Sequence, residues 1–214
     1  MATICAALPQ TAMTRPRWRV RRSRRGAAAL AAAAAAAAGL GAAAPAPKFA
    51  LLPVAGDGRC LFRSVAAARA LLAGGGRSDE RTERATADEL RGRAVAELAG
   101  RREELSWAVE HEASSFEDYL ARMSSPSAWG GEIEMLCLSH ALQEPIAVYM
   151  PATSTAHHNG ALVHGGQEMP LSRIALYGED YAPGECEPTS VASLLFDGVG
   201  HYQGLTPLPG DSKL

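Results

Sequence analysis

The clearest hydrophobic pattern in the chain follows a glycine-containing turn near residue 60. Leu61, Val65, Ala68 and Leu72 are spaced at i, i+4, i+7 and i+11, the spacing of one buried face of an α-helix. The polar and glycine residues before Cys60 predict that the helix begins there. The pattern therefore places Cys60 on the first turn of a helix that packs inward.

The middle of the chain is predicted to be mostly helical. Two Ser/Thr-x-x-Glu patterns, Thr86 to Glu89 and Ser114 to Glu117, predict capped helix starts. A helical stripe follows the second of them: Phe116, Tyr119, Leu120 and Met123. Trp129 and its two glycines predict a bend that packs a helix over 133–141 behind the site of Cys60, with a ligand-binding role for Trp129 as the weaker interpretation.

Short apolar runs near the C-terminus predict the strands of one sheet. They lie at 145–150, 174–177, 191–196 and 201–205. The stretch around 157–164 is rich in Thr, Ser, Asn and Gly, which predicts an exposed loop. The order of elements indicates helices first and a sheet completed late in the chain.

Cys60 stands in a setting that suits a nucleophile. The thiolate is the reactive form of cysteine, and the unpaired N–H groups at a helix N-terminus stabilise it. Gly56 and Gly58 allow a tight bend before the helix. A small buried side chain without chemistry explains a single cysteine equally well, so this block alone does not decide between the two.

A cysteine nucleophile needs a base, and histidine is a common one. His201 follows the apolar run 191–196 and a glycine loop, which predicts a position at the start of a strand beside a turn. His140 lies on an apolar helical face and is predicted to be a core residue, and His111 a solvated one. The other three are predicted loop residues without the spacing of a metal site: His157, His158 and His164.

Three blocks of the chain resemble the ovarian-tumour (OTU) family of cysteine proteases, which are deubiquitinating enzymes. They are D-G-R-C-L-F-R-S at Asp57 to Ser64, W-G-G-E at Trp129 to Glu132, and G-H-Y at Gly200 to Tyr202. Their order and separations resemble the plant and algal branch over about residues 50–206. The resemblance implies an α/β (α+β) papain-like cysteine protease fold of the OTU type, with a small central sheet flanked by helices.

The resemblance also implies roles for single residues. Cys60 corresponds to the nucleophile and His201 to the general base and acid. Asp57 is carried over as a site residue that orders the turn. The backbone N–H groups of that turn, those of Gly58 and Arg59, are expected to face the oxyanion. The implied partner is ubiquitin or a ubiquitin chain, and no metal or organic cofactor is implied.

One position departs from the family pattern. Members usually place Asp or Asn two residues after the histidine, whereas this chain has Gln203. An amide oxygen can orient an imidazole but carries no charge to stabilise the imidazolium, so we expect a slower enzyme rather than an inactive one. Asp57 and, more remotely, Asp197 are the alternative orienting groups.

Composition and charge agree with one enzyme domain and a leader. The 214 residues carry a formal net charge of -2, yet residues 1–47 contain seven arginines and no acidic residue, so the remainder is distinctly acidic. An acidic body disfavours nucleic-acid binding and could attract a basic partner surface. The four cysteines show no paired spacing, which favours a reducing compartment. We expect a leader over 1–47, a monomeric protease domain over 48–208 and a tail over 209–214.

The composition of the leader predicts import into an organelle. Arginine, serine and alanine without acidic residues are typical of plastid or mitochondrial transit peptides. A disordered tail on a cytoplasmic or nuclear protein, a twin-arginine signal and an alanine expansion are the alternatives. The uncharged run 26–47 is a poor candidate for membrane insertion, because alanine gains little in lipid.

Two other functions remain open at this point. The absence of an acid at Gln203 could mark a pseudoenzyme that binds ubiquitin without cleaving it. An organellar location could instead indicate a cysteine hydrolase that acts on another organellar protein. Both alternatives keep the same fold. The first lacks catalysis, and the second acts on a different substrate.

Overall fold

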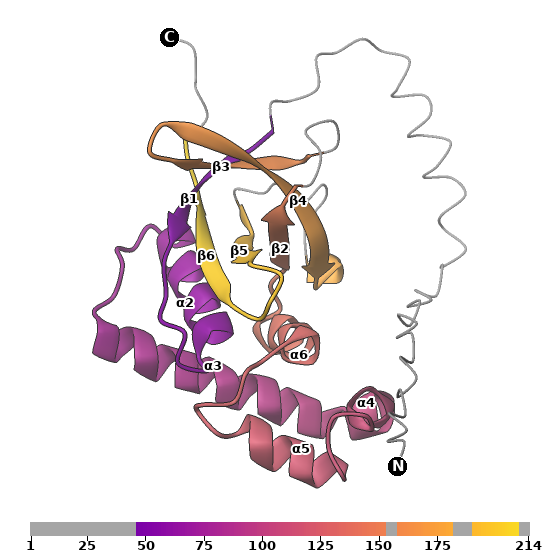
Figure 1. Ribbon diagram of the computed structural model, residues 1–214. Helices are drawn as coiled ribbons and strands as arrows, with labels where there is room; N and C mark the ends of the chain where they lie inside the picture. Colours follow the sequence, from indigo (N-terminus) through magenta and orange to yellow (C-terminus); the bar gives the residue numbers. More distant parts are fainter. Residues whose placement is uncertain (1–45, 153–157, 182–189, 210–214) are drawn as a thin grey trace, which may run out of the picture. The chain divides into compact units, whose positions relative to one another are not determined.

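A computed structural model describes residues 46–152, 158–181 and 190–209 (Figure 1). Its helices are α2 (Cys60–Leu72), α3 (Glu80–Gly100), α4 (Arg102–Val109), α5 (Phe116–Met123) and α6 (Glu132–Leu142). Its strands are β1 (Lys48–Leu52), β2 (Ile146–Pro151), β3 (Gly160–His164), β4 (Gln167–Tyr177), β5 (Ala192–Phe196) and β6 (Tyr202–Pro207). A short 3-10 turn, η1 (Glu179–Tyr181), follows β4. The predicted α/β class is confirmed.

The six strands form one mixed sheet that closes on itself in the order β1-β3-β4-β2-β5-β6. β1 pairs with β3 and β2 with β5 in parallel, and the other neighbours are antiparallel. β5 and β6 are a hairpin joined by the glycine loop 197–201. The start of β6 therefore lies where the sheet meets that loop.

Alternate residues of the same strands enter two separate cores. In β2, Ile146 and Val148 pack toward the helices, whereas Ala147 and Tyr149 face the inside of the closed sheet. Successive side chains of a strand point to opposite faces, so a continuous apolar run is buried on both sides. This explains why 146–149 is apolar without alternation.

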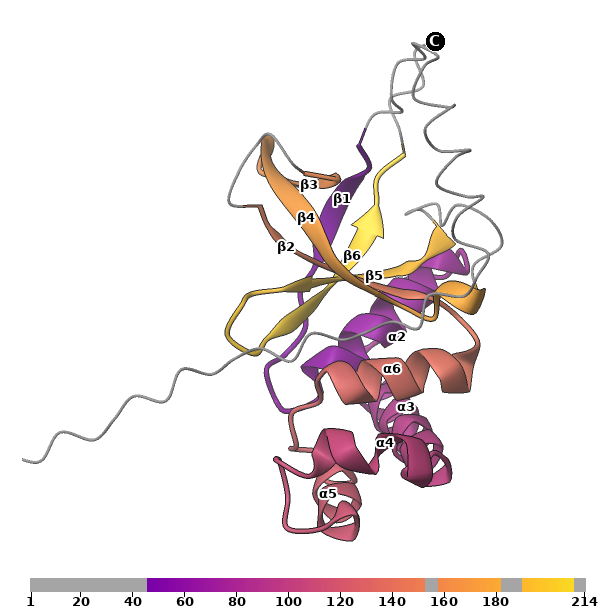
Figure 2. The same ribbon diagram turned by 90° about the vertical axis from the view of Figure 1, so that its right-hand side faces the viewer.

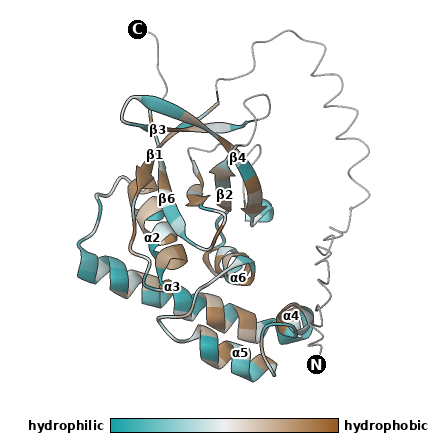
Figure 3. Ribbon diagram, in the orientation of Figure 1, coloured by the Kyte–Doolittle hydropathy of each residue, from teal (hydrophilic) through white to brown (hydrophobic). Residues whose placement is uncertain are grey.

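The helices gather on one side of the sheet (Figures 1 and 2). α2 packs on β5 and β6, α3 packs across α2 and α6, and α4 and α5 lie against α3. Figure 3 shows the resulting amphipathic pattern, with the first turns of α2 hydrophobic and much of α3 hydrophilic. The N-terminal end of α2 is thus fixed against the sheet beside β6.

The structure confirms the main predicted elements and corrects others. α2, the helix over 133–141 and the four predicted strands are present. The predicted start at Thr86 is wrong, because Thr86 lies inside α3, whose N-cap is Asp79. The cap of α5 is Ser115, not Ser114. The predicted loop around 157–164 is wrong over 160–164, which is β3, and no strand was expected at β1.

Several predictions concern residues outside the described ranges. Residues 1–45 of the predicted leader (1–47), residues 210–214 of the predicted tail (209–214) and His157 lie there. Among the described residues, His111, His158 and His164 are exposed. His140 is half-buried rather than fully buried, and its Nδ1 lies 2.7 Å from the Tyr181 hydroxyl. None of the described helices is long and apolar enough to span a membrane.

Candidate active site

Cys60 is the first residue of α2 and is only 4% exposed. The turn before it bends sharply at Gly58, whose φ is 86°. A Cβ at Gly58 would overlap the carbonyl group of Ser127, so the backbone of 127 lies directly against this turn. Glycine is required here both by its conformation and by the close approach.

The free N–H donors of this turn differ from those expected. The N–H of Arg59 donates to Asp57 Oδ1 at 3.2 Å. Within the described part of the chain, the N–H groups of Gly58 and Cys60 donate to no acceptor. Unpaired N–H groups at the first turn of a helix are available to bind an anion. Gly58 and Cys60, rather than Gly58 and Arg59, thus offer the free donors.

Asp57 orders the turn through two arginines. Its Oδ2 accepts a hydrogen bond of 2.7 Å from Arg63, which also donates to Glu83 at 2.9 Å. Burial by itself raises the pKa of Asp57, but the hydrogen bonds from Arg63 and from the Arg59 N–H outweigh it and hold this pKa below its usual value. The carboxylate is therefore kept ionised and bound to α2.

His201 immediately precedes β6 and is presented by a loop that Asp197 ties together. Asp197 Oδ1 accepts the N–H groups of Val199, Gly200 and His201 at 2.8, 2.9 and 3.0 Å. These three backbone hydrogen bonds lower the pKa of Asp197. Its N–H donates back to the His201 carbonyl at 3.1 Å. Asp197 thus fixes the backbone that carries the imidazole.

The structure brings the loop before Cys60 against the His201 ring. A Cβ at Gly56 would lie 3.6 Å from Nδ1 and 3.7 Å from Cε1 of His201. α2 packs along β6, so the first turn of the helix and the first residues of the strand are neighbours. Cys60 and Tyr202 accordingly share one buried cluster. Two sequence blocks that are far apart in the chain meet at this point.

Gln203 is the second residue of β6 and is half-buried. Because side chains alternate along a strand, Gln203 lies on the same face of the strand as His201, and buried Tyr202 lies on the other. The alternative acids are engaged elsewhere, Asp57 with Arg63 and Asp197 with backbone N–H groups. Gln203 is thus the polar side chain that strand geometry places with His201.

Trp129 lies beside the histidine loop, which its sequence context did not indicate. Trp129 is 63% exposed, and a Cβ at Gly200 would lie 2.5 Å from its Cζ3. The bend behind it is held by Glu134, which accepts the N–H of Gly131 at 2.8 Å and the Tyr119 hydroxyl at 2.9 Å. The expected bend before α6 is present, and Trp129 itself lies against the histidine loop.

Two described cysteines differ in chemistry. Cys137 is fully buried in α6, and burial raises its pKa to about 12. A thiol of that kind stays protonated near neutral pH and is inert. Cys60 instead begins a helix beside a histidine. Among the described residues, no cluster of three or more His, Cys, Asp or Glu side chains could hold a metal ion.

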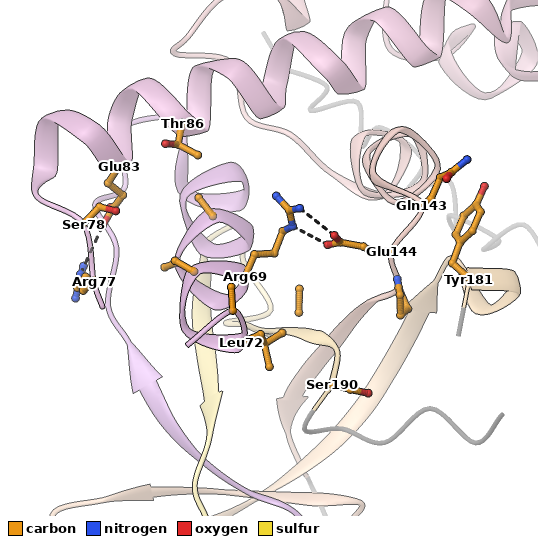
Figure 4. Close-up of a pocket in the computed structure, with 16 residues that line it drawn as sticks. Arg69, Leu72, Arg77, Ser78, Glu83, Thr86, Gln143, Glu144, Tyr181 and Ser190 are labelled. Atoms are coloured by element: carbon orange, nitrogen blue, oxygen red, sulfur yellow. Dashed lines mark hydrogen bonds and ion pairs between the residues drawn. The ribbon is translucent and has the colours of Figure 1, made fainter. Parts of the chain in front are cut away.

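A pocket of about 810 Å³ lies elsewhere in the molecule (Figure 4). It is bordered by α2, the start of α3 and the end of α6, and the Arg69–Glu144 ion pair crosses it. Neither Cys60 nor His201 lines it. The chemistry suggested by the cysteine and histidine therefore belongs to the other end of α2.

Comparison with known proteins agrees with this geometry. Residues 55–177 match the family described as OTU-like cysteine protease. Two relatives from Arabidopsis thaliana are named OVARIAN TUMOR DOMAIN-containing deubiquitinating enzymes 4 and 3. The chain is 40% identical to the first over 157 residues, and 34% identical to the second over 164 residues. The matched regions cover 73% and 72% of this chain, and 43% and 67% of the relatives, so it spans less than half of the first.

Solved structures show the same fold. The viral OTU domain protease from Taggert virus aligns with a TM-score of 0.52 at 15% identity, over 76% of this chain and 82% of that one. The protease from Dera Ghazi Khan virus aligns with a TM-score of 0.50 at 21% identity, over 75% and 82%. Together with the family match over more than half of its length, these findings show that the chain belongs to the OTU-like cysteine proteases.

Proposed function

We propose that the chain is a cysteine deubiquitinase, which hydrolyses the isopeptide bond between the C-terminus of ubiquitin and a lysine. The observation that carries the proposal is the contact between the loop before Cys60 and the His201 ring. The family membership and the names of the two plant relatives support ubiquitin as the substrate. The free N–H donors at the start of α2 support an acyl-transfer reaction.

The proposed reaction uses Cys60 and His201 twice. His201 takes the thiol proton, and Cys60 Sγ attacks the carbonyl carbon of the isopeptide bond. The N–H groups of Gly58 and Cys60 bind the oxyanion, and His201 gives its proton to the leaving lysine amine. Water, deprotonated by His201, then cleaves the thioester and releases the ubiquitin carboxylate and the free thiol.

A ubiquitin derivative with an electrophilic C-terminus tests the proposal. We expect it to label wild-type protein at Cys60 and to leave Cys60→Ala unlabelled, while Cys137→Ala is labelled like the wild type. Binding without labelling would instead favour a ubiquitin-binding pseudoenzyme, the alternative that Gln203 suggests. If the protein neither labels nor binds, ubiquitin is not the partner and a different protein substrate has to be sought.

The role of Gln203 is tested by two substitutions. We propose that its amide oxygen orients His201, so Gln203→Ala should lower kcat/KM by about tenfold and Gln203→Asp should raise it by a few fold, because a carboxylate stabilises the imidazolium better. Both are measured with a fluorogenic ubiquitin amide. If neither substitution alters turnover, Gln203 takes no part in the site.

A further inference from the structure

Arg91 is a buried arginine that binds backbone carbonyls. It lies in α3 and is 2% exposed. Its Nη2 donates to the carbonyl oxygens of Gly58 at 2.8 Å, Ala128 at 2.9 Å and Pro126 at 3.2 Å. Its Nη1 donates to the carbonyl oxygen of Met123 at 3.2 Å. One guanidinium therefore joins the turn before Cys60 to the segment that leads to Trp129.

This arrangement is unusual for a buried charge. Within the described residues, no carboxylate forms a hydrogen bond or ion pair with Arg91, and the Phe62 ring lies 4.5 Å from its Cζ. Burial lowers the pKa of Arg91. A buried cation is costly without an anionic partner, so an apolar side chain would serve packing at least as well. The fork of N–H donors does what an apolar residue cannot, because it fixes the directions of several carbonyls.

The carbonyl of Gly58 is the one that matters for chemistry. In a planar trans peptide the C=O and the following N–H point in opposite directions. By binding the Gly58 oxygen, Arg91 fixes the plane of the Gly58–Arg59 peptide and directs the Arg59 N–H to Asp57. The N–H of Cys60 comes directly after this peptide. The carbonyl oxygen of its own peptide, that of Arg59, accepts the Arg63 N–H at 2.8 Å, so Arg91 acts on the Cys60 N–H by holding the peptide that joins this helical turn to the loop.

The second contact reaches the other wall of the site. Ala128, whose carbonyl Arg91 binds, immediately precedes Trp129, and the Trp129 ring lies against Gly200 in the histidine loop. The same side chain is thus bonded on one side to the cysteine turn and on the other to the residue before Trp129, which lies against the histidine loop.

We propose that Arg91 is a positioning residue, which sets the oxyanion-binding N–H groups at Cys60 and couples that turn to the Trp129 wall of the site. The proposal rests on the proposed function for its kinetic consequence. Its structural content, the fixed carbonyls of Gly58 and Ala128, does not depend on which substrate is cleaved. Two kinds of measurement therefore test it.

The kinetic test compares Arg91→Lys and Arg91→Gln with the wild type on a fluorogenic ubiquitin amide. Lysine keeps the charge but cannot bind several carbonyls at once. We expect both variants to lower kcat by about 10- to 100-fold, because misplaced oxyanion donors act on the transition state, with KM changed by about twofold or less. Alkylation of Cys60 by iodoacetamide, which needs no oxyanion donor, should change by less than about threefold.

The structural test uses amide hydrogen exchange on the same proteins and requires no activity. We expect faster exchange at 57–60 and at 124–129 in both Arg91 variants, with α6 and β2 unchanged. Arg69→Gln is the matched control, since Arg69 is a helical arginine too, half-buried rather than buried. Its fork binds one partner, Glu144, at 2.6 and 2.9 Å in the pocket of Figure 4. It should leave both the kinetics and the exchange of these two segments unchanged.

Each outcome decides the proposal. Full activity of Arg91→Lys would overturn it, because a charge alone would then suffice. Equal losses in kcat and in Cys60 alkylation would mean that Arg91 activates the thiol rather than the oxyanion donors. If neither variant folds, Arg91 is required for the fold itself and the proposal fails. If the wild type does not cleave ubiquitin, only the proposed function falls, and the exchange data decide the role of Arg91.

Discussion

Replacing Cys60 by alanine is expected to reduce hydrolysis of a fluorogenic ubiquitin amide to background, a loss of about 10⁴-fold or more, because no other group can form the thioester. His201→Ala is expected to lower kcat by about 10³-fold, since the thiol loses its base and the leaving amine its acid. The double variant should be no slower than Cys60→Ala alone, because the two side chains act as one unit.

His140→Gln is the control for this comparison. His140 is a half-buried histidine in α6 that contacts Tyr181. Its replacement tests whether the loss of a histidine outside the site also lowers activity. We expect its kcat to stay within about threefold of the wild type. More than a tenth of wild-type activity in His201→Ala would show that the base lies elsewhere.

Gly58→Ala is expected to destabilise the protein by about 3 kcal/mol or more and to remove activity, because the new Cβ would need the space of the Ser127 backbone. The atoms that this Cβ would overlap belong to the main chain, so no side-chain rotation relieves the overlap. Either the turn before Cys60 or the segment before Trp129 must move. Urea unfolding and kcat measured on the folded fraction give the two effects separately.

Gly74→Ala separates this overlap from backbone strain. Gly74 follows α2, has a φ of 75°, and its Cβ would meet nothing within 4 Å. We expect a loss of about 1 kcal/mol from the left-handed conformation alone, with unchanged kcat. Equal losses of stability in the two variants would contradict the close contact between Gly58 and Ser127.

The sequence was most informative where chemistry depends on neighbours in the chain. The turn before Cys60 and the loop before His201 are local motifs, so their glycines and apolar flanks predicted a helix start and a strand start that the structure confirms. α6 was equally predictable from the sequence, because its apolar residues are nearly continuous. Local periodicity and turn residues are what a single sequence records best.

Features that depend on residues distant in the chain could not be predicted from the sequence. β1 and β3 are five residues each and are stabilised by pairing with each other and with β6 and β4, which no local pattern reports. Arg91 looks like any charged residue of a polar helix until the fold brings four carbonyls around it. A partial signal existed for α3, whose N-cap Asp79 precedes an acidic first turn.

The positions of the start of β1 and the end of β6 determine where another protein can be fused to this domain. Phe49 pairs with Pro207, and the N–H of Leu208 donates to the carbonyl of Lys48 at 2.8 Å, so the chain enters and leaves the sheet side by side. His201 lies at the opposite end of β6, six residues or about 20 Å away. A reporter fused before residue 46 or after residue 209 would start far from the imidazole. Adjacent ends also suit insertion of the whole domain into a surface loop of a host protein.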